Sequence, residues 1–346
     1  MAVLETFTDD RPADEVLRWS RAMVEPALRT AVDELDEPMR HVASYHFGWC
    51  DEQGRPTSGQ GGKVLRPALT LLCAEAVGGA PSSAVPAAVA VELAHNFSLL
   101  HDDVMDGDHT RRHRRTAWTV FGVDAAVLVG DGLLTLASHV VATSGHPAAQ
   151  DGTRLLSAAL LDLVNGQAAD LECEGRDDVD VAECLAMVNG KTAALLGAAC
   201  ALGASFGNAE QRQVTGMHEF GRQVGMAFQI ADDLLGIWGD PDVLGKPVHA
   251  DLRARKKTVP VVAALTSGTP AGQQLAELYN RATPLSESEL AHAAELIEAA
   301  GGRAWAREQT DAFLARALGQ LEAAGVRRRA CAELATLARL IVDRNH

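Results

Sequence analysis

The sequence predicts an all-α protein, and three observations support that fold class. Alanine and leucine recur at helical spacing over long stretches of the chain. Alternating runs of β-branched residues bounded by turn pairs, which would indicate strands, are nearly absent. Glycine and proline separate the helical stretches, but no break is long enough to be a linker. We therefore expect one domain over residues 1–346, with a loosely ordered N-terminal segment over residues 1–25.

The expected helices follow one another along the chain, each with apolar residues at every third or fourth position. The clearest stretches are 85–100, 125–141, 153–171, 192–206 and 286–300. Glycine and proline interrupt the pattern at 78–81, 144–147, 267–270 and 301–302. Two charged loops, 51–63 and 236–257, lie beside apolar stretches, and long loops of this kind are often functional.

Composition limits the classes of protein to consider. Of the 346 residues, 47% are hydrophobic and 22% are charged, which is enough apolar material for a large core. Lys and Arg total 31 against 46 Asp and Glu, a formal net charge of −15. This balance argues against a general binder of nucleic acid or anionic membranes, because such a protein needs a basic face. It leaves room for a small basic pocket that binds a phosphorylated metabolite.

Cysteine spacing and the N-terminal residues favour a reduced, cytoplasmic setting. None of the six cysteines forms a CxxC pair, so a structural zinc site is not expected. The first residues, MAVLETFTDDRPADE, are acidic and lack the apolar core of a secretory signal. We see no uninterrupted apolar stretch of about 18 to 20 residues, so stable membrane insertion is not expected.

A first acidic motif closes the apolar stretch 93–106. Asp102, Asp103 and Asp106 form the pattern DDxxD. On a helix, residues i and i+4 share a face, so Asp102 and Asp106 can bind one ion or two neighbouring ions. Carboxylate oxygens suit Mg²⁺, which is usually bound through one or two carboxylates plus substrate phosphates. The alternative for this cluster alone is a solvated helix end.

A second acidic pair, Asp232 and Asp233, follows an equally apolar stretch that contains Gln229. Basic residues follow both acidic clusters: Arg111, Arg112, Arg114 and Arg115 after the first, and Lys246, Arg253, Arg255, Lys256 and Lys257 after the second. Acids that bind Mg²⁺ beside cations that bind phosphate oxygens are what a metal–diphosphate site needs. The alternative is charge pairing on the surface.

Six stretches of the chain carry these features in a fixed order. They are GGKVLRPAL (61–69), HNFSLLHDDVMDGDHTRRHRRTAW (95–118), GQAAD (166–170), GKTAALL (190–196), FQIADDLLGIWGD (228–240) and GKPVHADLRARKKTVP (245–260). In that order and spacing they resemble the trans-isoprenyl diphosphate synthases of the polyprenyl synthetase family, from about residue 25 to the C-terminus. The resemblance implies a single polyprenyl synthetase domain, a bundle of long antiparallel helices around a deep cavity, usually as a homodimer.

The resemblance also implies a role for each matching residue. Positions that hold the diphosphate of isopentenyl diphosphate are matched by Lys63, Arg66, His95 and Arg112. Asp102 and Asp106, with Asp232 across the cavity, match the ligands of the Mg²⁺ ions, which number three when the allylic diphosphate is bound. Asp103 and Asp233 are further candidate ligands. Arg111, Lys191 and Lys256 match the residues that contact the allylic diphosphate in the family, and Lys246 is a further candidate. Groups beside the developing allylic cation are matched by Thr192 and Gln229.

The chain departs from the family pattern at several positions. Gly236 stands where the second acidic motif usually has its third acid, and Asp240 is a candidate substitute. Val64 stands where a basic residue is common, and His113 and Arg255 stand where glycine is usual.

Two residues before the first acidic motif bear on product length. The resemblance implies that small Ser98 with large Phe97 before it stops chain growth near twenty carbons, as in a geranylgeranyl diphosphate synthase. The primer would be dimethylallyl, geranyl or farnesyl diphosphate. The alternatives are a farnesyl diphosphate synthase, a class I terpene cyclase, or a non-catalytic, length-controlling subunit of a heteromeric synthase. For Phe97 itself, the alternative is plain core packing.

Overall fold

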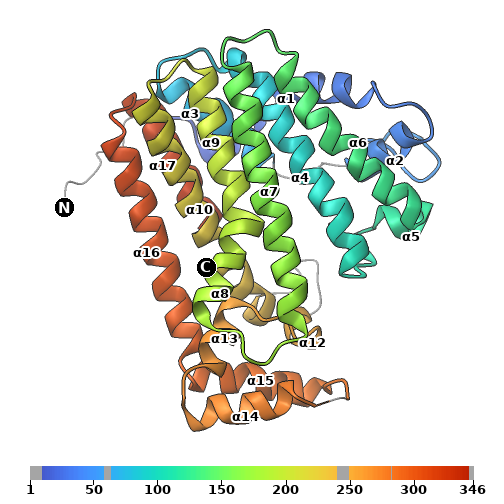
Figure 1. Ribbon diagram of the computed structural model, residues 1–346, viewed down its shortest axis with the longest axis vertical. Coiled ribbons are helices and arrows are strands. Elements are labelled where there is room, and N and C mark those ends of the chain that lie inside the picture. The colour runs from blue at the N-terminus through green and yellow to red at the C-terminus, as the bar shows by residue number, and fades with distance from the viewer. Residues whose placement is uncertain (1–9, 58–63, 240–248, 282, 343–346) are drawn as a thin grey trace. The chain divides into compact units, whose positions relative to one another are not determined.

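The computed structural model describes residues 10–57, 64–239, 249–281 and 283–342, and it confirms the all-α fold class (Figure 1). The helices are α1 (Ala13–Val32), α2 (Met39–His46), α3 (Leu65–Ala76), α4 (Val85–Met105), α5 (Ala117–Phe121), α6 (Val123–Ala142), α7 (Ala149–Glu174), α8 (Val181–Val188), α9 (Ala194–Phe206), α10 (Gln211–Trp238), α12 (Ala250–Arg253), α13 (Val259–Leu265), α14 (Pro270–Tyr279), α15 (Glu287–Ala299), α16 (Gly302–Ala323) and α17 (Arg328–Val342). Shorter elements are the 3-10 turn η1 (Pro81–Ala84), the π-helical turn η2 (Asn189–Ala193) and the strands β1 (Thr110–Arg111) and β2 (Arg114–Arg115).

The chain divides into two compact units. Unit 1 comprises Met1–Ala158, Ala198–His218 and Leu321–Leu337, and unit 2 comprises Ala159–Gly197, Glu219–Gln320 and Ala338–His346. The first acidic motif therefore belongs to unit 1 and the second to unit 2. The expectation of one domain over residues 1–346 stays a prediction.

In unit 1, α4 is the central element. It begins with Pro86 in its first turn, where a missing N–H costs nothing. It runs beside α6 (Figure 1), and α1 and α3 also pack against it. Leu93 and Leu100 of α4 and Leu133 of α6 are fully buried. An apolar helix held on several sides is a rigid base for the acidic residues at its C-terminal end.

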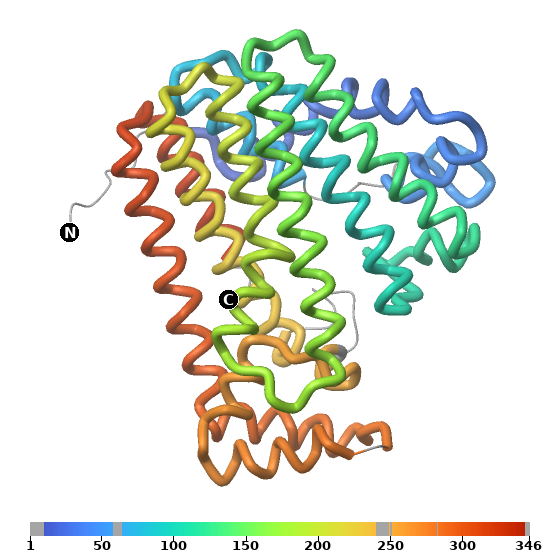
Figure 2. Tube along the Cα trace, in the orientation of Figure 1, coloured from blue at the N-terminus to red at the C-terminus, as the bar shows by residue number. Residues whose placement is uncertain are grey.

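In unit 2, α14 and α15 lie side by side (Figure 2), and their apolar faces share one core cluster with α13. The N-termini of α8 and α15 each carry a capping box, formed by Asp180 with Glu183 and by Ser286 with Glu289. In each box the side chains accept N–H groups that the first helical turn leaves without partners. These caps explain why both helices begin where they do.

The N-terminal helix differs from the expectation for residues 1–25, because α1 begins at Ala13. One face of α1, including Val16 and Val24, is buried. Just before the helix, the guanidinium group of Arg11 forms ion pairs with Glu333 at 2.6 Å and with Glu75 at 3.2 Å. Apolar burial and these ion pairs order the segment within unit 1.

Three helices are long and apolar enough to cross a membrane, which corrects the expectation that no stretch reaches that length. They are Pro81–Met105, Val123–Ala142 and Val181–Phe206. The buried share of the most apolar 18-residue window is 72% in the first, 39% in the second and 67% in the third. The expectation was wrong because it required an uninterrupted apolar run, whereas these helices include scattered polar residues such as Glu92 and Lys191. This finding rests on length and composition alone.

Candidate active site

The first acidic motif lies at the C-terminal end of α4. Asp102 and Asp106 are one helical turn apart and half-buried. Asp103 is only 1% exposed; its Oδ1 accepts a hydrogen bond from Nε of Arg111 at 2.7 Å and forms an ion pair with Nη2 at 2.6 Å. The motif thus has two tasks: Asp102 and Asp106 are accessible to a ligand, and Asp103 fixes the position of Arg111.

Arg111 and Arg112 lie in the β1–β2 hairpin. Its two turn residues, Arg112 and His113, have φ angles of 51° and 62°. Asparagine and glycine suit such a turn best, because a Cβ atom makes left-handed backbone unfavourable by roughly 1–2 kcal/mol per residue. This is a physical reason for the glycine that the resemblance implies at position 113, and His113 holds the turn at a cost. The hairpin lets Arg111 reach Asp103, while Arg112 also lines a pocket that Glu92 and Asn96 of α4 border.

Three of the residues expected to bind isopentenyl diphosphate gather in unit 1. Burial lowers the pKa of Arg66 to about 10; nearby Glu92 opposes that shift and Arg112 adds to it. Burial, together with Arg66 and Arg112, holds the pKa of His95 well below its usual value, so the imidazole is neutral at pH 7. Nε of Arg66 is buried and has no hydrogen-bond partner among the described residues. Two neighbouring guanidinium groups, of which Arg66 is half-buried, favour an anionic ligand. Lys63, the fourth expected residue, lies outside the described residues.

Phe97 and Ser98 lie one turn before the acidic motif on α4. Phe97 is 5% exposed, and its ring meets the ring of His101 edge-on at 4.9 Å. Nε2 of His101 lies 3.0 Å from the carbonyl oxygen of Val127 on α6. A Cβ at Gly130 would lie 2.2 Å from that nitrogen, so the glycine makes room for the histidine. Phe97 therefore packs on the side of α4 that faces α6, and its role in product length stays a prediction.

In unit 2, Lys191 and Thr192 lie in η2, one turn of π-helix between α8 and α9. Such turns are rare and occur frequently at functional sites. The turn crosses α7 in direct backbone contact: a Cβ at Gly166 would lie 2.1 Å from the backbone nitrogen of Lys191. A Cβ at Gly190 would lie 2.8 Å from the carbonyl oxygen of Asp162. Two glycines thus set how closely the turn approaches α7.

The side chains of the turn are held by specific partners. Nζ of Lys191 forms an ion pair with Oδ2 of Asp170 at 2.5 Å. The hydroxyl of Thr192 donates to Oε1 of Gln229 at 2.7 Å. Asp170 lies in the GQAAD stretch, to which sequence reasoning gave no role. The ammonium group of Lys191 is therefore positioned by a carboxylate that the motif spacing did not single out.

The second acidic pair repeats the division of tasks seen in the first. Oδ1 of Asp233 accepts from Nε2 of Gln229 at 2.9 Å, and Oδ2 accepts from the backbone N–H of Val259 at 3.0 Å. Burial raises the pKa of Asp233 to about 8, although both hydrogen bonds oppose the shift. Asp232 is exposed. Of the two candidate metal ligands, Asp232 is accessible to a ligand and Asp233 joins α10 to the start of α13.

The space beside Gly236, where the family usually has a third acid, is taken by another carboxylate. A Cβ at Gly236 would lie 2.0 Å from Oδ2 of Asp251 on α12. The charge of Asp251 also adds to the raised pKa of Asp233, after the effect of burial. Sequence reasoning missed Asp251 and named Asp240 instead, which lies outside the described residues. Only the approach of α12 to α10 within unit 2 brings Asp251 to this place.

The basic loop of unit 2 is partly described. Lys256 is half-buried, and its backbone N–H donates to the carbonyl oxygen of Asp251 at 2.9 Å. Arg255 has a φ of 53°, which explains why glycine is usual there. Its guanidinium group donates to the backbone carbonyls of Tyr279, Arg281 and Thr283, which offsets the backbone cost. Lys246 lies outside the described residues.

The donor set fits Mg²⁺. Among the described residues, no group of three or more His, Cys, Asp or Glu side chains is arranged as a ready metal cage. Mg²⁺ does not require one, since it commonly binds through one or two carboxylates and keeps its other positions for water and substrate phosphates. Asp102 and Asp106 in unit 1 and Asp232 in unit 2 are accessible acids of that kind.

Comparison with known proteins agrees with this chemistry. The family model of polyprenyl synthetases matches residues 48–297. A (2E,6E)-farnesyl diphosphate synthase of Mycobacterium tuberculosis is 46% identical over 95% of this chain and 92% of its own length. A geranylgeranyl diphosphate synthase of the same species is 43% identical over 91% of each chain. The crystal structure of a polyprenyl synthetase from Streptomyces coelicolor A3(2) has a TM-score of 0.91 and 48% identity, covering 95% of this chain and 99% of that one. The chain therefore belongs to the polyprenyl synthetase family and is a trans-prenyltransferase of the farnesyl or geranylgeranyl diphosphate synthase type.

Proposed function

We propose that this trans-prenyltransferase condenses isopentenyl diphosphate with an allylic diphosphate to give farnesyl diphosphate as its main product. The observation that carries the reaction is in unit 1, where an accessible acid pair at the end of α4 lies on the same unit as two neighbouring arginines, Arg66 and Arg112, and a neutral His95. The farnesyl product is supported by the 46% identity to a farnesyl diphosphate synthase. This reverses the order of the sequence expectation. The C20 product remains the second candidate, favoured by the pair Phe97 and Ser98 and by the 43% identical geranylgeranyl diphosphate synthase.

On the homoallylic side, Arg66 and Arg112 bind the diphosphate of isopentenyl diphosphate. Two guanidinium groups offer several N–H donors to phosphate oxygens, and their partly buried setting strengthens each charge-assisted hydrogen bond. His95, neutral by its environment, adds one N–H donor without adding charge. Lys63 completes this set in the proposal.

On the allylic side, we propose that Asp102, Asp106 and Asp232 hold Mg²⁺. Beside them, Asp103 accepts from Arg111, and Asp233 accepts from Gln229 and Val259. When bound, Mg²⁺ neutralises the diphosphate leaving group. Lys191, Arg111 and Lys256 supply fixed positive charges for the remaining phosphate oxygens, with Lys246 as a further candidate.

The bond changes follow from that arrangement. The allylic C–O bond breaks, and its electron pair leaves with the diphosphate. The double bond of isopentenyl diphosphate then attacks the allylic carbon, and the departing diphosphate accepts the proton that is lost. Because the hydroxyl of Thr192 donates to Oε1 of Gln229, the lone pairs of the hydroxyl oxygen and the second lone pair of Oε1 are left to stabilise a cation. Apolar helix walls exclude the water that would quench it.

Two other activities are weighed against specific residues. A class I terpene cyclase usually has an Asn/Ser/Glu metal triad on the second helix, whereas this chain has QIADDLLG there. A non-catalytic subunit is conceivable because of Gly236, but Asp251 supplies a carboxylate beside that position. We propose a cytoplasmic homodimer, and the exposed apolar residues Val123 and Leu128 of α6 support a partner surface.

A direct assay tests the proposal. The purified chain is incubated with isopentenyl diphosphate, Mg²⁺ and dimethylallyl, geranyl or farnesyl diphosphate, and the dephosphorylated products are separated by chromatography. We expect linear C15 product from the two shorter primers. Release of a cyclic hydrocarbon without consumption of isopentenyl diphosphate would identify a cyclase, and activity only after a second subunit is added would identify a regulatory chain.

Arg66→Gln should weaken the use of isopentenyl diphosphate selectively. Loss of a charge-assisted contact to a phosphate is expected to raise the KM for isopentenyl diphosphate by about tenfold or more, with the KM for the primer nearly unchanged. Steady-state kinetics with each substrate varied in turn measures both constants. Equal increases in the two KM values would contradict separate diphosphate sites.

Phe97→Ala distinguishes a product-length role from core packing. If Phe97 limits the chain, its removal lengthens products by one or more five-carbon units. If Phe97 only packs between α4 and α6, the substitution costs roughly 3 to 5 kcal/mol of stability and leaves product length unchanged. Product chromatography on a variant with a cooperative thermal transition decides, and an unshifted product distribution would exclude Phe97.

A further inference from the structure

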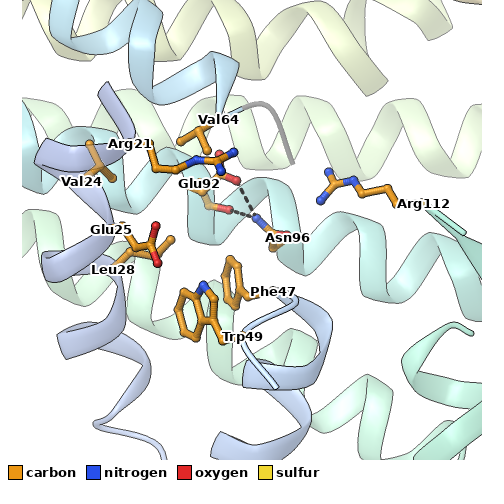
Figure 3. A pocket seen from close by; sticks show the side chains of 10 residues that line it. All are labelled: Arg21, Val24, Glu25, Leu28, Phe47, Trp49, Val64, Glu92, Asn96 and Arg112. Atoms are coloured by element: carbon orange, nitrogen blue, oxygen red, sulfur yellow. Dashed lines mark hydrogen bonds between the residues drawn. The ribbon is translucent and has the colours of Figure 1, made fainter. Parts of the chain in front are cut away.

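A carboxylate lies buried among the cations of unit 1. Glu92 on α4 is 7% exposed, although an isolated buried carboxylate is strongly unfavourable. It lines a pocket together with Arg21 of α1 and Arg112 of the hairpin. Figure 3 shows these two arginine side chains reaching toward Glu92 and Asn96 from opposite sides. Arg66 contributes a third nearby positive charge.

The orientation of Glu92 is fixed by a chain of hydrogen bonds. Nδ2 of Asn96 donates to Oε1 of Glu92 at 3.1 Å and to the carbonyl oxygen of Glu92 at 2.8 Å (Figure 3). Oδ1 of Asn96 lies 3.1 Å from Nε2 of His46. Burial and the neighbouring Arg112 and Arg111 lower the pKa of His46 to about 3, so its ring is neutral and Nε2–H can donate to Asn96. Each group in this chain therefore has one defined orientation.

The cations need a counter-charge before any ligand binds. Burial lowers the pKa of both Arg66 and Arg112, with a further lowering by Arg112 at Arg66 and by Arg111 at Arg112. Glu92 is the group that opposes this shift most in each case. Without it, two neighbouring guanidinium groups would turn apart toward solvent. With it, part of the repulsion is offset and the cluster keeps a net positive charge.

We propose that Glu92 is a positioning residue that holds Arg66 and Arg112 in the arrangement that receives the diphosphate of isopentenyl diphosphate. The inference rests on the proposed function of this site. Glu92 does not touch the substrate. It acts through the two arginines, and its own orientation depends on Asn96 and His46.

Whether removal of the Glu92 charge weakens or tightens binding of isopentenyl diphosphate distinguishes a positioning role from a purely electrostatic one. Removing a negative charge beside an anion site should tighten anion binding if charge alone matters. It should weaken binding if the carboxylate holds the arginines in place. Glu92→Gln keeps the size of the side chain and an oxygen that can accept from Asn96, so it removes mainly the charge that holds the guanidinium groups.

The test is titration of the full-length wild type and the Glu92→Gln variant with isopentenyl diphosphate by calorimetry, without primer, so that no turnover occurs. We expect the Kd to rise at least tenfold in the variant, while the KM for geranyl diphosphate changes less than twofold. Glu25→Gln is the matched control, since Glu25 lines the same pocket but pairs with Arg29 on the surface of α1. Its Kd should equal that of the wild type.

Two further variants keep the test decisive. In an Arg66→Gln background, the additional loss from Glu92→Gln should shrink, because one of the positioned groups is gone. If Glu92→Gln does not fold, Glu92→Asp replaces it, since a shorter side chain keeps the charge but not the position and should also weaken binding. An unchanged or lower Kd in the folded variant would overturn the inference. A wild type that does not bind isopentenyl diphosphate would instead overturn the proposed function.

Discussion

Asp102→Ala should reduce turnover by about a thousandfold or more while leaving the fold intact. Asp102 is half-buried at the C-terminal end of α4, so its truncation leaves the apolar face of the helix unchanged. Loss of one metal-binding carboxylate removes stabilisation of the leaving diphosphate, and about 4 kcal/mol of lost transition-state stabilisation corresponds to a factor of a thousand. Initial rates at several Mg²⁺ concentrations, with thermal unfolding in parallel, measure both parts of the prediction.

The control for this prediction is Asp124→Ala. Asp124 is an exposed acid in the first turn of α6, so the same chemical change is made away from the motif. Its turnover should stay within about twofold of the wild type, as for most surface substitutions. Near-normal turnover of Asp102→Ala at saturating Mg²⁺ would remove Asp102 from the metal site.

Gly166→Ala should impair the enzyme almost as severely, although residue 166 has no side chain to do chemistry. The added Cβ would lie 2.1 Å from the backbone nitrogen of Lys191 and 2.7 Å from the carbonyl carbon of Gly190. Both atoms belong to the backbone, so α7 and η2 must move apart. A displacement of about 1 Å in groups that position substrate can cost roughly a hundredfold in rate, and an overpacked contact typically costs about 1–3 kcal/mol of stability.

Gly175→Ala is the matched control for this change. Gly175 also belongs to unit 2, just after α7, and a Cβ there would meet no atom within 4 Å. Its rate and melting temperature should stay close to those of the wild type. If Gly166→Ala retained both the wild-type kcat and the wild-type melting temperature, then the close approach of α7 to η2 would not position Lys191 and Thr192.

The parts of the site that sequence could predict are those determined by local periodicity. Asp102 and Asp106 share a face because both belong to one continuous helix, and this follows from their spacing alone. The roles of Asp103 and Asp233 could not be predicted, because each depends on a partner in another element: Arg111 in the hairpin and Val259 at the start of α13. Local spacing treats the two members of an acidic pair as equal, whereas tertiary packing separates them.

The departures from the family pattern show the same limit. His113 and Arg255 look like unexplained bulk in the sequence, but the structure shows that both adopt left-handed backbone, where glycine is favoured. The absence of an acid at position 236 looks like a loss, but Asp251 places its carboxylate in the space beside that glycine. Backbone angles and contacts between distant segments are not encoded in the identity of a single residue, so neither explanation was available from the motifs.

The π-helical turn η2 also has a consequence for insertions and deletions. A π-turn contains one residue more than the α-helical turn it replaces, so it shifts the angular phase of every following side chain by about 100°. Leu196 and Ala193 meet the bare backbone of Gly225 on α10 in this phase. Deleting one residue from Asn189–Ala193 would produce a regular α-helix with good local geometry, but it would rotate Leu196 away from Gly225 and turn Thr192 away from Gln229. A substitution in this turn changes single contacts. A one-residue deletion instead rotates the part of the helix that carries the site relative to the part that packs in the core.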